Sequence, residues 1–280
     1  MTQPSGRKNM LLAAAGALPF VSRGDTVPDR RVTVEDLAVD PANVAEYAGV
    51  TGLRFGDTVP LTYPFALTFP SVMSLVSGFD FPFAAMGSVH VENEITQYRP
   101  IAVTDTVGVE VHAENLREHR KGLLVDVITD VSVGNETAWH QVTTFLHQQK
   151  TSLSDEPRPE QKKPQKLPPP NAVLHITPGQ IRHYAAVGGD HNPIHTSSLG
   201  AKLFGFPTSI AHGMFTAAAV LANIEAQLPD AVRYSVRFGK PVLLPARVGL
   251  YVDRVAGGWE LALRNLSKGY PHLTGTVSAL

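Results

Sequence analysis

The chain has 280 residues, a formal net charge of -1 and no cysteine. A nearly neutral chain gives no electrostatic reason to expect nucleic acid or an anionic membrane as its partner. Without cysteine it can form no disulfide, thiolate metal site or cysteine nucleophile. Its hydrophobic content of 43% is enough for one large core or two ordinary ones.

An apolar run, Met10–Val21, follows the basic residues Arg7 and Lys8. The run has the pattern of a signal-peptide core, or of a short helix that Pro19 ends. It is too short to span a bilayer, and no convincing small-x-small cleavage site follows it. We therefore expect a cytoplasmic, uncleaved protein with no membrane span, in which residues 1–25 form an N-terminal extension.

Residues 154–170 are rich in proline and charge and contain almost nothing apolar. Such a segment cannot bury a core and is typical of an extended linker. It divides the chain into 26–153 and 171–280, each about the size of one small domain.

The two halves begin alike. Thr177 opens the sequence TPGQ, which predicts a capping box with proline at the first helical position, and Asp40-Pro41 opens the first half similarly. YAGVTG at 47–52 then echoes YAAVGG at 184–189.

Further pairs keep a steady offset. Pro64 and Pro207 lie 143 positions apart, and Arg99 and Lys240 lie 141 apart. Offsets this constant indicate an internal duplication.

Each half also carries alternating apolar residues, which predict strands. These positions are Val107, Val109, Val111, Leu123, Val125, Val127, Trp259, Leu261 and Leu263. Apolar helices are expected at Ser71–Ser77 and Met214–Gln227. The pattern predicts, in each half, a sheet wrapped around one long helix.

The segment GGDHNPIH holds Asp190, Asn192 and His195 within six residues, with Pro193 fixing the backbone between them. A carboxylate and an imidazole on one stiff loop can hold a water molecule, one accepting a proton while the other donates. Asn192 is positioned to orient the pair or the substrate. Taken separately, the loop is also a common turn sequence, and a lone histidine is more often structural.

Gly213 lies at the expected start of the second apolar helix, after Ala211-His212. The first N–H groups of a helix have no partner within it. An unshielded N–H here would stabilise a thioester carbonyl that becomes an enolate. The alternative is that the glycine only permits close packing of helix and sheet.

The repeat allows a comparison of the two copies. By the offset of 143, Gly213 matches Pro70, which has no N–H to donate. Tyr47 and Pro64 are 17 positions apart, against 23 between Tyr184 and Pro207. The first copy therefore lacks both the loop with Asp190 and His195 and the N–H at the helix start. Their joint absence favours a functional role for these two features in the second copy.

GGDHNPIH followed by the AHG step resembles the MaoC-like family of (R)-specific enoyl-CoA hydratases and 3-hydroxyacyl-thioester dehydratases. The resemblance implies an α+β double hotdog, with two antiparallel sheets each wrapped around a central helix and packed as a pseudo-dimer. It implies that 171–280 is the catalytic copy and that 26–153 is a degenerate copy that shapes an acyl tunnel.

The resemblance also assigns roles. Asp190 and His195 would form the catalytic dyad, Asn192 would assist it, and the Gly213 N–H would form the oxyanion hole. The expected reaction is reversible hydration of a trans-2-enoyl thioester to an (R)-3-hydroxyacyl thioester in fatty-acid metabolism. No bound cofactor or metal is expected, because coenzyme A or acyl carrier protein arrives with the substrate.

The sequence leaves several matters open: the acyl length, the carrier, the net direction, the pairing of two chains into a homodimer, and which of Asp190 and His195 is the acid. Arg237 and Lys240 either contact a phosphorylated carrier arm or are solvated charges.

Three other functions are compatible with parts of the sequence. Asp190, His191, His195 and His212 offer ligands that suit several divalent metals, although Asn192-Pro193 then has no role. An acyl-thioester hydrolase of related fold would need its water aimed at the carbonyl carbon. A non-enzymatic acyl-binding module would not depend on the Asp190 carboxylate.

Overall fold

The computed structural model describes residues 23–157 and 168–280. The apolar run Met10–Val21 and most of the expected linker lie outside these ranges. Within them, no helix is both long and apolar enough to cross a membrane.

The two halves repeat one order of elements: a strand, two main helices and four strands. The first half consists of β1 (Val32–Ala38), α2 (Pro41–Thr51), α3 (Tyr63–Val76), β2 (Ser88–Gln97), β3 (Thr106–His119), β4 (Gly122–Val133) and β5 (Glu136–Gln148). The second consists of β6 (Ala172–Ile176), α4 (Pro178–Gly188), α5 (Pro193–Thr196), α6 (Ser198–Leu203), α7 (Gly213–Leu221), η1 (Glu225–Gln227), β7 (Val232–Phe238), β8 (Ala246–Val255), β9 (Gly258–Asn265) and β10 (Pro271–Ala279). The short helices α5 and α6 occupy the extra length expected between α4 and α7.

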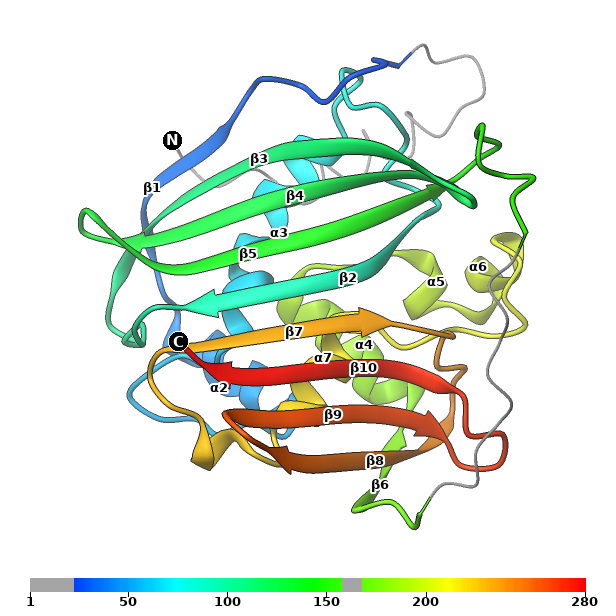
Figure 1. Ribbon diagram of the computed structural model, residues 1–280. Helices are drawn as coiled ribbons and strands as arrows, with labels where there is room; N and C mark the ends of the chain where they lie inside the picture. The colour runs from blue at the N-terminus through cyan, green and yellow to red at the C-terminus, as the bar shows by residue number, and fades with distance from the viewer. Residues whose placement is uncertain (1–22, 158–167) are drawn as a thin grey trace.

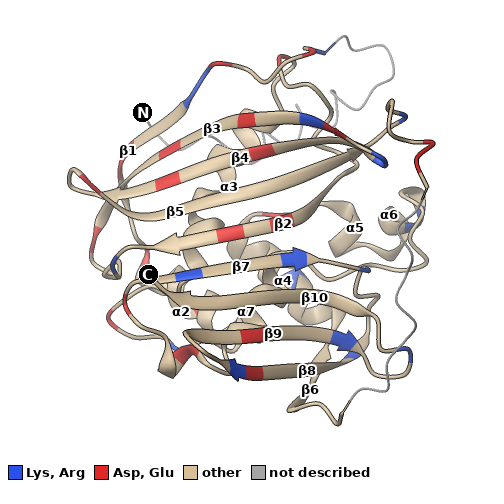
Figure 2. Ribbon diagram, in the orientation of Figure 1, with Lys and Arg blue, Asp and Glu red and all other residues tan. Residues whose placement is uncertain are grey.

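All ten strands form a single sheet, in the order β1-β3-β4-β5-β2-β7-β10-β9-β8-β6. The halves meet where β2 pairs antiparallel with β7, with Asn93 opposite Val236 and Ile95 opposite Tyr234. The two expected sheets are thus joined edge to edge into one, behind which the main helices lie (Figure 1). Charged residues of both signs are spaced along several strands of this sheet, including β3, β7 and β9 (Figure 2).

Both helix starts follow the sequence prediction. The Asp40 side chain accepts a hydrogen bond of 2.9 Å from the Ala42 N–H. Thr177 and Gln180 form the complete capping box. The alternating positions in β3 and β9 are buried, including Val109 and Leu261, so these predictions are confirmed.

The expected limits of the two central helices were wrong. α3 begins at Tyr63, eight residues before Ser71, and continues through Pro70. Proline usually ends a helix, but α3 is packed against the sheet along most of its length, and tertiary packing overrides that preference. Pro70 therefore matches Gly213 by offset while lying inside a helix rather than at its start. α7 ends at Leu221, earlier than expected, near Asn223, whose side chain bonds the Ala219 carbonyl.

Candidate active site

The 189–196 loop follows directly from the end of α4. Gly189 adopts a left-handed conformation (φ +77°), which ends the helix and turns the chain. The Asp190 carboxylate accepts the Asn192 N–H at 3.2 Å. The Asn192 side chain in turn accepts the Ile194 N–H at 3.2 Å and caps α5. Asn192 thus stiffens the loop that carries the expected dyad.

The surroundings of His195 fix its tautomer. Its Nδ1 lies 2.9 Å from the Ile210 carbonyl oxygen. A carbonyl can only accept, so Nδ1 carries the hydrogen and Nε2 keeps a lone pair. Burial lowers the pKa of His195, and the nearby Asp190 charge opposes this only in part. The imidazole is therefore neutral near pH 7, with Nε2 as a proton acceptor.

Asp190 and His195 lie close together. One side-chain oxygen or nitrogen from each of Asp190, His195 and His212 lies within 4.8 Å of the others. Two hydrogen bonds of about 2.8 Å each, meeting at one oxygen, bridge a separation of this size. Two ligands of a tetrahedral zinc ion, at about 2.0–2.1 Å from the metal, lie closer together than this upper limit. A separation within this limit is compatible with a water molecule shared by Asp190 and His195.

His212 is a site residue for which the sequence predicted no catalytic role. It is 3% exposed, its Nε2 donates to the Asp190 backbone oxygen at 3.0 Å, and its ring stacks on that of His195. Burial, with the neighbouring His195 as the next cause, lowers the pKa of His212 to about 3. The AHG step placed His212 beside Gly213, but no local pattern shows that its ring reaches the dyad.

Gly213 is the first residue of α7, as expected. The first backbone bond of this helix runs from the Thr216 N–H to the His212 oxygen at 3.2 Å. Within the described part of the chain, no acceptor takes the Gly213 N–H. A side chain at this position would also meet the Phe238 ring at 3.1 Å. The glycine therefore leaves an N–H available and permits close packing, as both readings required.

These groups open onto one cavity of about 460 Å³. The second half supplies its polar side, which includes Asp190, His195 and Gly213. The first half supplies an apolar wall from one face of α3, formed by Phe65, Phe69, Pro70, Met73 and Val76. A mainly apolar cavity with a few convergent polar groups is typical of a site for a small organic ligand.

The two basic residues singled out in the sequence differ in their surroundings. Arg237 pairs with Glu92 at 2.8 Å on the outer face of the sheet. Lys240 lines the cavity and lies 4.4 Å from the centre of the Tyr270 ring. Of Arg237 and Lys240, only Lys240 lies where a ligand in this cavity would meet it.

Comparison with known proteins identifies the class. The family model described as "MaoC like domain" matches residues 159–269. The chain is 76% identical, over the whole length of both proteins, to 3-hydroxyacyl-thioester dehydratase X of Mycobacterium tuberculosis. The chain therefore belongs to the MaoC-like dehydratase family.

Solved structures agree. A crystal structure of HtdX from Mycobacterium tuberculosis matches with a TM-score of 0.82 at 73% identity, covering 90% of this chain and 100% of that one. Another protein of that organism, described as having a double hotdog fold, matches with a TM-score of 0.50 at 13% identity, covering 90% and 96%. The second likeness bears on the fold alone. The expected double hotdog is confirmed.

Proposed function

We infer that this chain is a hydro-lyase, a 3-hydroxyacyl-thioester dehydratase of fatty-acid metabolism that interconverts trans-2-enoyl and (R)-3-hydroxyacyl thioesters. The observation that carries this inference is the approach of Asp190 and His195 to within 4.8 Å beside a cavity that Gly213 also lines. A carboxylate, a neutral imidazole and a free N–H are the groups that hydration beside a thioester requires.

In the hydration direction, Asp190 and His195 hold one water molecule. His195 Nε2 accepts a proton from this water as its oxygen attacks C3 of the enoyl group. The Gly213 N–H stabilises the enolate oxygen that forms on the thioester. His195, now protonated, returns a proton to C2. In dehydration the steps run in reverse, and His195 begins as the base that removes the C2 proton.

The substrate enters as a thioester of coenzyme A or of acyl carrier protein. The reaction needs no resident cofactor, because the carrier arrives with the substrate. The acyl tail lies along the face of α3 in the first half. That half has no counterpart of the 189–196 loop. Lys240 lines the cavity, as Lys121 does, and is proposed to meet the phosphorylated arm. A phosphate there would gain a charge-assisted hydrogen bond.

The test is an assay with a trans-2-enoyl-CoA, following the conjugated absorbance and free thiol together. Loss of absorbance without thiol release is expected. Release of thiol would instead identify a hydrolase. If the parent and the Asp190→Asn variant bind acyl-CoA equally well and neither turns it over, the protein is an acyl-binding module.

A further inference from the structure

The 77–87 loop, which joins α3 to β2, lines part of the cavity. Phe83, Ala85 and Met86 of this loop line the cavity together with Val76. The 189–196 loop contacts α3 near Phe69, where a side chain at Gly189 would meet the ring at 3.9 Å. Val76 lies seven residues farther along α3, about 10 Å at 1.5 Å per residue. The 77–87 loop therefore faces the far end of a bound acyl tail.

Residues 23–31, which precede β1, hold this loop from outside. The Arg23 guanidinium donates to the Gly78 oxygen at 2.9 Å and to the Phe83 oxygen at 3.2 Å. In Figure 1 the blue segment before β1 runs along the top of the molecule, beside the cyan loops. The segment thus bonds the backbone of a residue, Phe83, whose side chain forms the cavity wall.

Arg30 makes the second connection. Its guanidinium meets both carboxylate oxygens of Asp80, at 2.6 and 3.1 Å, and donates to the Leu75 oxygen at 2.7 Å. Leu75 lies in the last turn of α3, and its carbonyl also accepts the Gly78 N–H at 3.2 Å. The hydrogen bond from Arg30 also holds the pKa of Asp80 below its ordinary value. One side chain therefore ties the end of α3 to the loop that follows.

Two glycines leave room for these contacts. A side chain at Gly78 would meet Arg30 Nη2 and an Asp80 carboxylate oxygen, each at 2.2 Å. A side chain at Gly24 would meet the Asp80 backbone oxygen at 2.6 Å. Gly78 has no left-handed φ, so alanine there would disturb the Arg30–Asp80 contact without straining the backbone.

We propose that Arg23 and Arg30 form a clamp that keeps the 77–87 loop closed over the end of the cavity, and that this clamp limits the length of the acyl chain that the enzyme accepts. The part concerning acyl length rests on the proposed function. Releasing the clamp lets Phe83 and Met86 move outward, which lengthens the cavity without touching the dyad.

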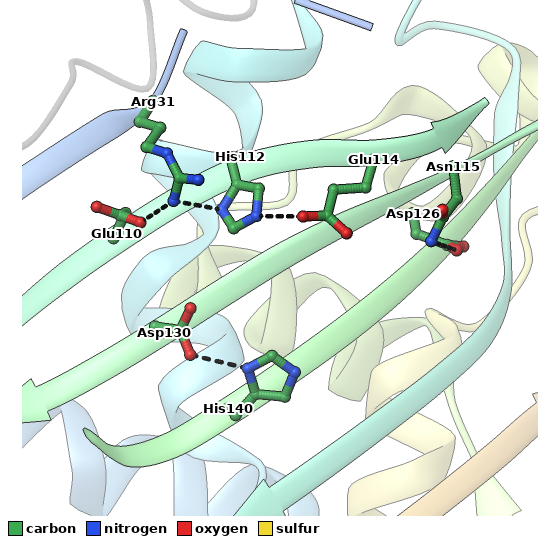
Figure 3. Close-up of polar contacts among 8 residues, drawn as sticks. All are labelled: Arg31, Glu110, His112, Glu114, Asn115, Asp126, Asp130 and His140. Carbon is green, nitrogen blue, oxygen red and sulfur yellow. Dashed lines mark hydrogen bonds and ion pairs between the residues drawn. The ribbon is translucent and has the colours of Figure 1, made fainter. Parts of the chain in front are cut away.

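Arg31 supplies the matched control. It follows Arg30 directly, but its guanidinium turns to the outer face of the sheet, where it meets Glu110 and His112 (Figure 3). Arg31→Ala removes the same charge from the same segment without touching the 77–87 loop.

The experiment measures kcat/KM for trans-2-enoyl-CoA substrates of four to sixteen carbons. In Arg30→Ala and Arg23→Ala, the ratio of long-chain to short-chain kcat/KM should rise about tenfold, the lower end of what one methylene group is worth in a hydrophobic pocket. It should not change in Arg31→Ala. A folded Arg30→Ala protein with the parent's length profile would overturn the proposal. Gly78→Ala and Arg30→Lys carry the same test if Arg30→Ala does not fold.

Hydrogen exchange of residues 77–87 tests the clamp without any assay of activity. Exchange should be faster in Arg30→Ala than in Arg31→Ala, and equal rates would refute the clamp. A parent enzyme that is inactive at every chain length would refute the proposed function instead, so the two failures are distinguishable.

Discussion

The rings of His195 and His212 stack with their centres 3.8 Å apart and their planes at 29°. A positive charge on one imidazole ring would lie close to the other ring, in a largely apolar environment. Burial lowers the pKa of both histidines, and the neighbouring His195 lowers that of His212 further. The stack therefore favours a neutral pair, which is the form in which His195 can accept a proton.

Removing either member of the dyad should abolish most of the activity. We expect His195→Gln to lower kcat by about 10²–10⁴-fold, the usual worth of general acid–base catalysis, and Asp190→Asn to lower kcat because the water loses the carboxylate that helps to hold it. The melting temperature should change little, because both side chains border the cavity. His175→Ala, an exposed site on β6, is the control. Retained turnover in either dyad variant would remove the assignment.

The two roles of Gly213 can be separated with two substitutions. Gly213→Ala adds a side chain against Phe238 but keeps the N–H. Gly213→Pro also removes the N–H, at the first helical position, where proline is tolerated. The preceding His212 has φ -62° and ψ 139°, which are compatible with a following proline.

We expect kcat for Gly213→Pro to fall about 10²–10³-fold below that of Gly213→Ala, which is the cost of losing one oxyanion donor. Circular dichroism should show that both variants keep their helices. If the two variants are equally active, the glycine serves packing alone.

The pH profile should reflect the burial of His195. Because burial lowers its pKa, the imidazole stays neutral below the ordinary value of 6.5. In the hydration direction, kcat/KM should therefore stay flat as pH falls through 6.5 and decline only at more acidic pH. An acidic limb centred at or above 6.5, measured with a short enoyl-CoA, would contradict this.

Stability should also fall in acid. Burial lowers the pKa of both His90 and His212 from 6.5 to about 3. Between these values the unfolded chain binds protons that the folded chain does not, so stability decreases as pH falls below 6.5. Each group contributes roughly 1.4 kcal/mol per pH unit in this window. Urea unfolding between pH 7 and 4.5 measures the decline.

His90→Gln lacks one of these groups and should lose less stability than the parent over the same interval. The comparison matters because His140 acts in the opposite sense. Its hydrogen bond to Asp130 (Figure 3) raises its pKa, which gives stability that is present at low pH and lost as pH rises. An equal decline in parent and variant would exclude His90.

The sequence predicted what local chemistry determines. The capping box at Thr177, the tight loop around Asp190 and the buried alternation in β9 each depend on a few neighbouring residues. The limits of α3 were wrong because a proline inside a helix, here Pro70, is tolerated only where tertiary packing compensates for it. The sequence did not predict that His212 contacts the dyad, because this role depends on a contact with Asp190, 22 positions away. It did not predict the role of Arg30 either, because Arg30 contacts Asp80, 50 positions away.

The pairing of β2 with β7 makes one continuous body from two copies that have diverged. In a homodimer of single hotdogs, both subunits have the same sequence, so every mutation appears twice. A mutation that widens the tunnel in one subunit therefore also alters the catalytic loop of the other. Fusion into a single chain removes that symmetry. One copy can lose its loop and devote its helix to the shape of the cavity, while the other keeps the chemistry. An enzyme built in this way has one reaction centre in place of two. In return, mutations in one copy can change which substrates reach that centre without altering the catalytic residues of the other copy.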